Sequence, residues 1–338
     1  DGSQVAANQP RFDVIDGVLG LMVEEGTTNL FPTNLALSFS SAWTSWTLNG
    51  TYTVSIKGGT GSLVLSGGAS GTVNVGSSLT FTVSNATVTF TPSGGTPAYC
   101  QLEQKPYATS FIDGTRAAET LTIPTAGVLK SQEGTVELTY IPFLDSSKVA
   151  LGAAQQDWWW IFGAGSAPIS NELRLAYVEG AWHVRVGGSS DTTYTASFAA
   201  GDKISLALAW KQGVDARFFI NGVKVATFTP YNFDVGTIAW IGYFQLWTGY
   251  RCNGLIDDLR ISNRARTDAE IAAAYASGQP LPVDEWTTYL LRFSGALNFG
   301  RGGYYISPQY DLSTVGSYVK HRVYWQEDAD KEECLVYA

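Results

Sequence analysis

Short runs in which apolar and polar residues alternate recur along this chain, and glycine-rich breaks separate them. Between Thr51 and Gly95 the runs read TYTVSIKGG, GSLVLSGG, GTVNVGSSLTFTV and ATVTFTPSGG. A period of two residues is that of a strand with one buried face, and glycine marks the turns between strands. The sequence therefore predicts an all-β protein, and a small β-sandwich or meander in this first region.

A second β region follows, with ETLTIP at Glu119 to Pro124, GTVELTYIPF at Gly134 to Phe143, ELRLAYVEGAWHVRVGG and DKISLALAWKQG. The segment ARFFINGVKVATF holds Asn221-Gly222 between two alternating runs. A type I′ turn needs positive φ at both central residues, which Asn-Gly supplies. We expect a hairpin there.

One short helix interrupts the strands. Thr267 and Glu270 have the spacing of a capping box, in which each side chain binds the backbone N–H of the other residue. The helix should run through IAAAYAS and stop at Gly278, because Pro280 and Pro282 follow.

The length of 338 residues suits two or three domains. We place a glycine-rich β-sandwich segment at 1–118, a second β domain at 119–282, and the start of a further β domain at 283–338, truncated at its end. The net charge of -9 opposes the phosphate neutralisation that nucleic-acid binding needs. It leaves neutral sugars open as partners.

The chain shows neither a signal sequence nor an apolar run of the roughly 18 residues needed to span a bilayer. We expect no membrane insertion. The three cysteines, Cys100, Cys252 and Cys334, have no CxxC spacing, so we expect reduced thiols rather than a zinc site or a disulfide framework.

Two phrases, GLMVEEGTTNLFPTN at Gly20 to Asn34 and QLEQKPYATSFIDGTRAAETLTIP at Gln101 to Pro124, resemble segments of bacteriophage tail and fibre proteins. The resemblance implies a structural virion protein, assembled in the host cytoplasm into a tail, fibre or appendage. It also implies a homo-oligomer, with a trimer favoured, other virion proteins as partners, and attachment to host surface polysaccharide.

The middle third resembles the laminin-G-like, or concanavalin A-like, jelly roll. GTVELTYIPF is similar to its entry strand, FFINGVKVAT to its central hairpin and GLIDDLRISNRARTDAEI to its closing strand and helix. The resemblance implies two antiparallel sheets and a role in glycan or protein binding. The segment SPQYDLSTVGSYVKHRVYW is similar to the start of another sandwich in tail proteins.

Enzymes of the concanavalin-like fold need a carboxylate pair facing a cleft. The nearest cluster, Glu327, Asp328, Asp330, Glu332 and Glu333, lies outside the jelly roll and reads as a solvated turn. His183 and His321 read as solvated strand positions, with His183 on the same face as Ala181 and Arg185. We therefore expect no enzyme and no catalytic residue.

Laminin-G-like domains often bind calcium, an ion that prefers oxygen ligands. This resemblance makes Asp257 and Asp258 candidate calcium ligands, although adjacent strand residues point to opposite faces, so one at most reaches a given site. No cofactor is otherwise expected.

Sugars stack on exposed aromatic rings, so loop aromatics beside polar groups are the candidate glycan contacts. They are Trp158, Trp159, Tyr231, Phe233, Trp247, Tyr250 and Arg251. The alternative is that these side chains belong to the core or to a subunit interface, as we expect for Trp182, Trp210 and Trp240.

The sequence thus favours a structural virion protein that acts in assembly and host attachment. Three alternatives stay open: a lectin-like module of a receptor-binding protein, a secreted bacterial adhesin, and a glycan-degrading enzyme, against which the missing carboxylate pair argues.

Overall fold

The structure of the chain is a computed structural model. It describes residues 11–15, 17–40, 44–148, 158–165, 171–188, 190–243, 251–279 and 281–292, with short strands at 305–306, 320–323 and 334–337. The chain divides into two compact units. Glu24–Glu119 make up most of the first unit, and Pro10–Val23, Thr120–Ser146 and the chain from Trp158 onward make up the second.

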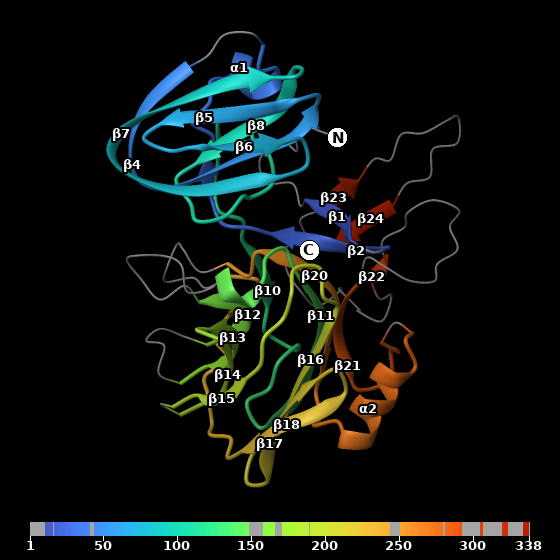
Figure 1. Cartoon of the computed structure of the whole chain (residues 1–338). Coiled ribbons are helices and arrows are strands. Elements are labelled where there is room, and N and C mark those ends of the chain that lie inside the picture. The colour runs from blue at the N-terminus through green and yellow to red at the C-terminus, as the bar shows by residue number, and fades with distance from the viewer. Residues whose placement is uncertain are drawn as a thin grey trace. The chain divides into compact units, whose positions relative to one another are not determined.

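The first unit is built on one five-stranded antiparallel sheet with the strand order β6-β5-β7-β4-β8 (Figure 1). The strands are β4 (Thr44–Gly59), β5 (Ser62–Gly67), β6 (Gly71–Asn74), β7 (Ser78–Ser93) and β8 (Pro97–Glu103). The expected strands are present, hydrogen-bonded into one sheet rather than into two. Helix α1 (Thr33–Leu37) and the short pair β3 (Thr27–Thr28) and β9 (Thr115–Arg116) complete the unit.

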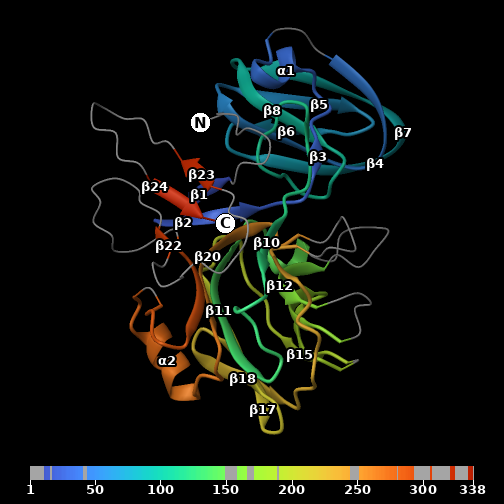
Figure 2. The same ribbon diagram turned by 180° about the vertical axis from the view of Figure 1, so that it is seen from behind.

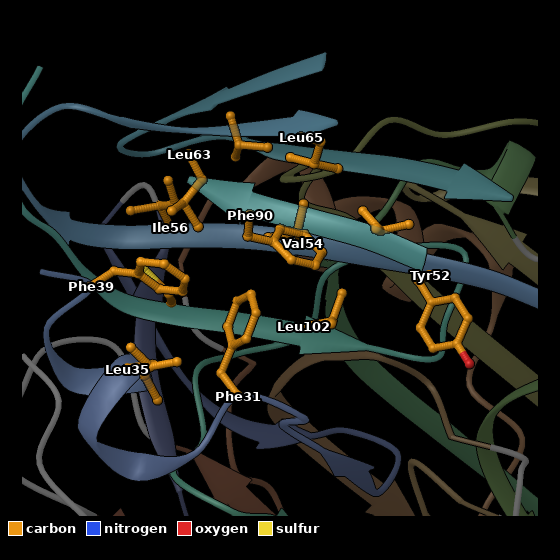
Figure 3. Packing of buried hydrophobic residues seen from close by; sticks show 14 of the residues in the cluster. Phe31, Leu35, Phe39, Tyr52, Val54, Ile56, Leu63, Leu65, Phe90 and Leu102 are labelled. Atoms are coloured by element: carbon orange, nitrogen blue, oxygen red, sulfur yellow. The ribbon is translucent and has the colours of Figure 1, made fainter. Parts of the chain in front are cut away.

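One face of this sheet carries the core of the first unit. Phe31, Leu35 and Phe39, from α1 and the residues around it, lie against apolar side chains of β4, β5, β7 and β8 (Figure 3). Cys100 is free and lies in this core, where burial raises the pKa of its thiol to about 12. The other face carries serine and threonine pairs such as Ser45–Thr89 and Thr51–Thr82.

Buried polar side chains join the two ends of the first unit. The Glu103 carboxylate accepts hydrogen bonds from the hydroxyls of Thr27 and Thr109 at 2.7 Å. Glu24 and Glu119 hydrogen-bond to each other twice, at 3.0 Å from the Glu119 N–H to the Glu24 carbonyl and at 2.7 Å from the Glu24 N–H to the Glu119 carboxylate. The chain therefore enters and leaves this unit at one place.

The second unit contains two large antiparallel sheets and a separate two-stranded one (Figure 1). The larger follows the order β1-β2-β20-β11-β16-β17-β18, with β21 on β20 and β22 on β21. Its strands are β1 (Phe12–Ile15), β2 (Val18–Val23), β11 (Glu133–Pro142), β16 (Ile204–Lys211), β17 (Asp215–Ile220), β18 (Val223–Phe228), β20 (Gly254–Ser262), β21 (Thr287–Arg292) and β22 (Tyr305–Ile306).

The smaller sheet has six strands in the order β10-β19-β12-β13-β14-β15. They are β10 (Leu121–Pro124), β12 (Trp159–Ala164), β13 (Leu173–Val178), β14 (Ala181–Val186), β15 (Thr192–Thr195) and β19 (Ile238–Ile241). A one-turn helix η1 (Ser146–Lys148) follows β11, and β23 (Lys320–Val323) pairs with β24 (Cys334–Tyr337).

Large aromatic side chains fill the space between the two sheets. Trp182 of β14 contacts Phe218 of β17 with ring centroids 6.2 Å apart, and Phe198 packs on Tyr177 at 4.7 Å. Trp210 is fully buried, as expected, and so is Trp182. Two antiparallel sheets enclosing one core is the jelly-roll architecture that the middle of the sequence predicts.

The N-terminal strands differ from the expected domain order. β2 pairs with β20, with Leu21 opposite Ile256 and Val23 opposite Gly254. Residues 10–23 thus belong to the jelly-roll unit, and the unit formed by Glu24–Glu119 is inserted between its strands β2 and β10. These strands were not predicted from the sequence, and the partner of β2 lies more than two hundred residues further along the chain.

The C-terminal boundary differs in the same way. β21, placed by the sequence in a further domain from 283, pairs with Leu259–Ser262 of β20 and so extends the jelly-roll sheet. β20 is therefore bordered on one side by β11 and on the other by β2 and β21 in succession.

The hairpin and the helix are confirmed. Asn221 and Gly222 have φ of 51° and 74° between β17 and β18. Helix α2 (Asp268–Ala276) begins with Thr267 and Glu270 in a capping box. Its Ile271 packs on Ala207, Ala209 and Phe219, on the face of the larger sheet that points away from the six-stranded one (Figure 2).

Candidate functional site

The face of the six-stranded sheet that points away from the core carries charged and aromatic side chains; we call it the outer face. The strand register aligns Trp160, Ala176, His183 and Thr193 in one row across β12 to β15. The next row holds Trp240, Gly163, Arg174 and Arg185. Side chains in a row across neighbouring strands are close enough to interact.

Gly163 makes room for the Trp160 ring on this face. A Cβ at position 163 would lie 2.5 Å from Nε1 of Trp160, too close for any side chain. The ring therefore lies flat along the sheet instead of pointing away from it. Trp160 packs there with Ala176, Trp240 and Tyr243.

The Arg174 guanidinium packs against two tryptophan rings. Its Cζ is 4.8 Å from the ring centroid of Trp158 and 5.0 Å from that of Trp160. A guanidinium at this distance over an indole is attracted by the negative face of the ring. The Trp158 ring also meets the His183 imidazole edge-on at 5.1 Å, so both contacts orient it.

An ion-pair network forms the floor of the site. Asp191 accepts hydrogen bonds at 2.8 Å from Nη1 of Arg174 and from Nε of Arg185, and its Oδ2 lies 3.2 Å from Nδ1 of His183. Glu172 accepts a bond of 2.9 Å from Nε of Arg174. We refer to Glu172, Arg174, His183, Arg185 and Asp191 as the outer-face network.

The pKa values of the two carboxylates in this network shift in opposite directions. Burial raises the pKa of Glu172 above its ordinary value in spite of the charges of Arg174 and Arg185. Burial would also raise the pKa of Asp191, but the hydrogen bond with His183 and the charges of Arg174 and Arg185 outweigh it, so that pKa is lowered. Two arginines beside two acids leave the floor close to neutral.

Exposure increases from the floor to the rim. The Glu172 side chain is 2% exposed and that of His183 is 20% exposed. Trp158 is half-buried, and Thr193 at the edge of the sheet is exposed. The accessible part of the site is therefore an aromatic ring, an imidazole and a hydroxyl above a neutral, rigid ionic floor.

The aromatic residues predicted from the sequence as glycan contacts lie in different environments. Trp158 lies on the outer face as described. Trp159 is buried on the opposite side of the strand, where its ring packs on Phe198 at 5.9 Å, because neighbouring strand residues point to opposite faces. Phe233 is also buried, with its ring 6.0 Å from that of Trp210. Trp159 and Phe233 are thus core residues rather than glycan contacts.

The remaining candidates divide as follows. Tyr231 is 58% exposed. Arg251 is buried, with its guanidinium 4.8 Å from the ring centroid of Tyr243. Trp247 and Tyr250 lie outside the described residues, as do the acidic residues at 327–333.

Asp257 and Asp258 are buried, and Asp258 is engaged by an arginine. Its Oδ1 accepts a 2.7 Å hydrogen bond from Nε of Arg292, and its Oδ2 accepts one of 2.7 Å from the Leu281 N–H. Arg292 thus provides the positive charge that calcium would otherwise supply. Within the described ranges, no group of three or more His, Cys, Asp or Glu side chains could hold a metal ion.

Most of the outer-face network was not predicted from the sequence. Strand alternation puts His183 and Arg185 on one face, which the register confirms. The same alternation applied to ELRLAYV would have put Glu172 and Arg174 on a common face. Asp191 follows β14 in a turn, where no periodic pattern indicates which side chains it meets.

Comparison with known proteins agrees with this architecture. Residues 113–272 match the family model described as the Concanavalin A-like lectin/glucanases superfamily. The second unit is accordingly a concanavalin A-like jelly roll, within an almost entirely β chain. The search of curated proteins gave no match.

Similar solved structures come from several sources. A putative carbohydrate binding protein from Bacteroides ovatus is 13% identical, with 75% of this chain and 84% of that chain covered and a TM-score of 0.39. The Trypanosoma rangeli sialidase is 18% identical over 46% of this chain, at a TM-score of 0.37. The tailspike protein 2 of Bacteriophage CBA120 is 14% identical over 52% of this chain, also at 0.37.

These matches extend over unequal shares of the other proteins. The match spans 24% of the sialidase chain and 32% of the tailspike chain.

Among the helices of the described residues, none is long and apolar enough to cross a membrane.

Proposed function

We propose that this chain binds carbohydrate through the outer face of its six-stranded sheet. The observation that supports it is the half-buried Trp158 ring, oriented by Arg174 at 4.8 Å and by His183 at 5.1 Å. A fixed aromatic ring offers a stacking surface to the apolar C–H face of a sugar. The jelly roll that presents it matches a family whose description names lectins.

The chemistry around Trp158 suits a neutral sugar. The Arg174 and Arg185 charges are met by Glu172 and Asp191, so a charged ligand would have to compete with the ion pairs already formed. The His183 imidazole and the exposed Thr193 can instead hydrogen-bond sugar hydroxyls. Neutral oligosaccharide is therefore the ligand class that we propose.

We propose binding without catalysis. Glycoside hydrolysis needs an acid that reaches the leaving oxygen and a second carboxylate that reaches the sugar. Glu172 is 2% exposed and bound to Arg174, and both Asp191 oxygens accept hydrogen bonds from the network. Neither carboxylate is presented to a ligand.

The test is binding of the chain to an array of neutral oligosaccharides and bacterial surface polysaccharides, for the wild type and two variants. Trp158→Ala should abolish binding. Trp286→Ala is the matched control, because Trp286 is an accessible tryptophan that also stacks with an arginine, Arg264, but it directly precedes β21 of the larger sheet. Equal binding by the wild type and Trp158→Ala would refute the proposal.

The biological setting that we propose is a bacteriophage tail or fibre. It is supported by the two phage-like phrases. Their parts in the first unit are hydrogen-bonded to each other, with Thr27 opposite Arg116 and Thr28 opposite Thr115. In this setting the chain forms a homotrimer, contacts other virion proteins and attaches to host polysaccharide. Light scattering of the purified chain should give three copies per particle, and antibodies against the chain should label virions. A monomeric chain whose antibodies label no virion would contradict this setting.

A further inference from the structure

Tyr231 presents an open aromatic ring in the loop between β18 and β19, and it is 58% exposed. The ring rests on the backbone of Gly188, where a Cβ would lie 2.8 Å from Cδ2 of Tyr231. The Tyr231 N–H donates a 2.7 Å hydrogen bond to the Val186 carbonyl at the end of β14. One side of the ring is thus supported and the other faces solvent.

Two consecutive glycines make this arrangement possible. Gly187 and Gly188 have φ of 64° and 74°, a region that L side chains rarely adopt. A Cβ at Gly187 would lie 2.3 Å from the Tyr231 carbonyl oxygen. The loop can approach β14 this closely only because both positions lack a side chain.

The same glycine turn adjoins the outer-face network. Gly187 donates a hydrogen bond of 3.0 Å to the Glu172 carbonyl, and Gly188 donates one of 3.1 Å to the side-chain oxygen of Asn171. Asp191, which binds Arg174 and Arg185, lies three positions after Gly188 in the sequence. The network therefore extends from the Trp158 and His183 rings to the base of the Tyr231 loop.

The distance along β14 from His183, beside Trp158, to Gly187, beside Tyr231, suits an oligosaccharide rather than a single sugar. His183 and Gly187 are four residues apart along β14 and its extension, which corresponds to roughly 13 Å at the rise of an extended strand. A single pyranose does not span that length, whereas an oligosaccharide does.

We propose that Tyr231, seated on Gly187 and Gly188, is a second sugar-stacking position that binds a distal unit of the same oligosaccharide. This inference rests on the proposed binding of sugar at Trp158. The ligand is then a glycan chain of several units, in which one sugar unit stacks on Trp158 and a distal unit stacks on Tyr231.

The experiment is calorimetric titration of the whole chain with mono- to hexasaccharides of glucose, galactose, mannose and N-acetylglucosamine. The wild type should bind the longer members of one series more tightly than the shortest. Tyr231→Ala should reduce affinity for the longer members about tenfold while changing affinity for the shortest that binds by less than about twofold.

Tyr275→Ala is the matched control, because Tyr275 is also an exposed tyrosine whose ring packs on a glycine, Gly222. It should bind every member as the wild type does. Thermal unfolding verifies that both variants are folded. The inference would be overturned, with sugar binding still standing, by either of two results for Tyr231→Ala: an equal loss of affinity for short and long saccharides, or no loss for the long ones. It would also be overturned if the affinity of the wild type did not depend on saccharide length. Absence of binding to any saccharide by the wild type would overturn the proposed function as well.

Discussion

Asp191 joins three side chains that arrive from two different strands. Arg174 comes from β13, and His183 and Arg185 come from β14. Asp191 lies in the connection between β14 and β15, directly before Thr192, so its position depends on the arginines as much as theirs depend on it. Hydrogen bonds between a carboxylate and guanidinium groups are among the stronger polar contacts in proteins.

The first prediction concerns acid stability. The folded-state pKa of Asp191 is lowered, so its contribution to stability is complete above the unfolded-state pKa and is lost as the pH falls through the folded value. The Glu172 pKa is raised, so Glu172 contributes in the opposite sense and favours folding at low pH. Asp191→Asn should lower the free energy of unfolding by about 2 kcal/mol at neutral pH.

The same variant should flatten the loss of stability as the pH falls below about 4, the ordinary aspartate pKa. Urea denaturation at a series of pH values measures both effects. Glu179→Gln is the control, since it removes one exposed carboxylate from the β13–β14 turn. A pH profile of Asp191→Asn parallel to that of the wild type would show that Asp191 has no such role.

At the scale of elements, local signals predicted local structure well. The Asn221-Gly222 hairpin and the capped helix α2 form where the residues indicate, because each depends on contacts a few positions apart. The triplet Trp158 to Trp160 shows the limit. Strand alternation predicts that Trp159 faces away from its neighbours, but not which side of the sheet is the core.

The strand β20 also departs from simple alternation. Its register with β11 shifts between Glu137 and Thr139, and Asp258 in the opposing segment has φ of 52°. The shift turns the Asp258 carboxylate toward Leu281 and Arg292, which brings β21 onto the sheet. Asp258, one of the two aspartates predicted as calcium ligands, thus anchors the strand β21 to the sheet.

The second prediction follows from this anchor. Arg292→Ala leaves the buried Asp258 carboxylate without its guanidinium and should weaken the attachment of β21 by about 1–3 kcal/mol, which raises amide exchange roughly five- to 150-fold. Hydrogen exchange at Thr287–Arg292 measures it. Lys224→Ala removes an exposed ion pair with Asp268 instead and should leave that exchange unchanged. Unaltered protection of β21 in Arg292→Ala would contradict the anchor.

For the whole molecule, the sequence predicted consecutive β modules, whereas the structure has one unit inserted into another. β1 and β2 precede the insert; β1 pairs with β2, and β2 pairs with β20, far along the chain. Strand pairing at this separation leaves no mark in local periodicity, which is why the boundary at 118 appeared to be the end of a separate domain. The jelly roll itself was predicted because its strands and helix follow in a familiar order.

The third prediction tests the insertion. The Glu24 carbonyl and the Glu119 N–H are 3.0 Å apart, so a short Gly-Ser linker can replace residues 25–118. The shortened chain should unfold cooperatively on heating and keep the sugar affinity of the full chain, since the outer face lies entirely in the second unit. A shortened chain that shows no cooperative transition would mean that the jelly roll requires the insert.

The central claim is that sugar binds beside Trp158, and indole N–H resonances of the isotope-labelled full chain test it most directly. Trp158→Phe and Trp286→Phe assign the two signals. Titration with an oligosaccharide that binds on the array should shift the Trp158 resonance in proportion to occupancy and leave that of Trp286 in place. A saccharide that binds while the Trp158 resonance stays unmoved would place the site elsewhere and contradict the account.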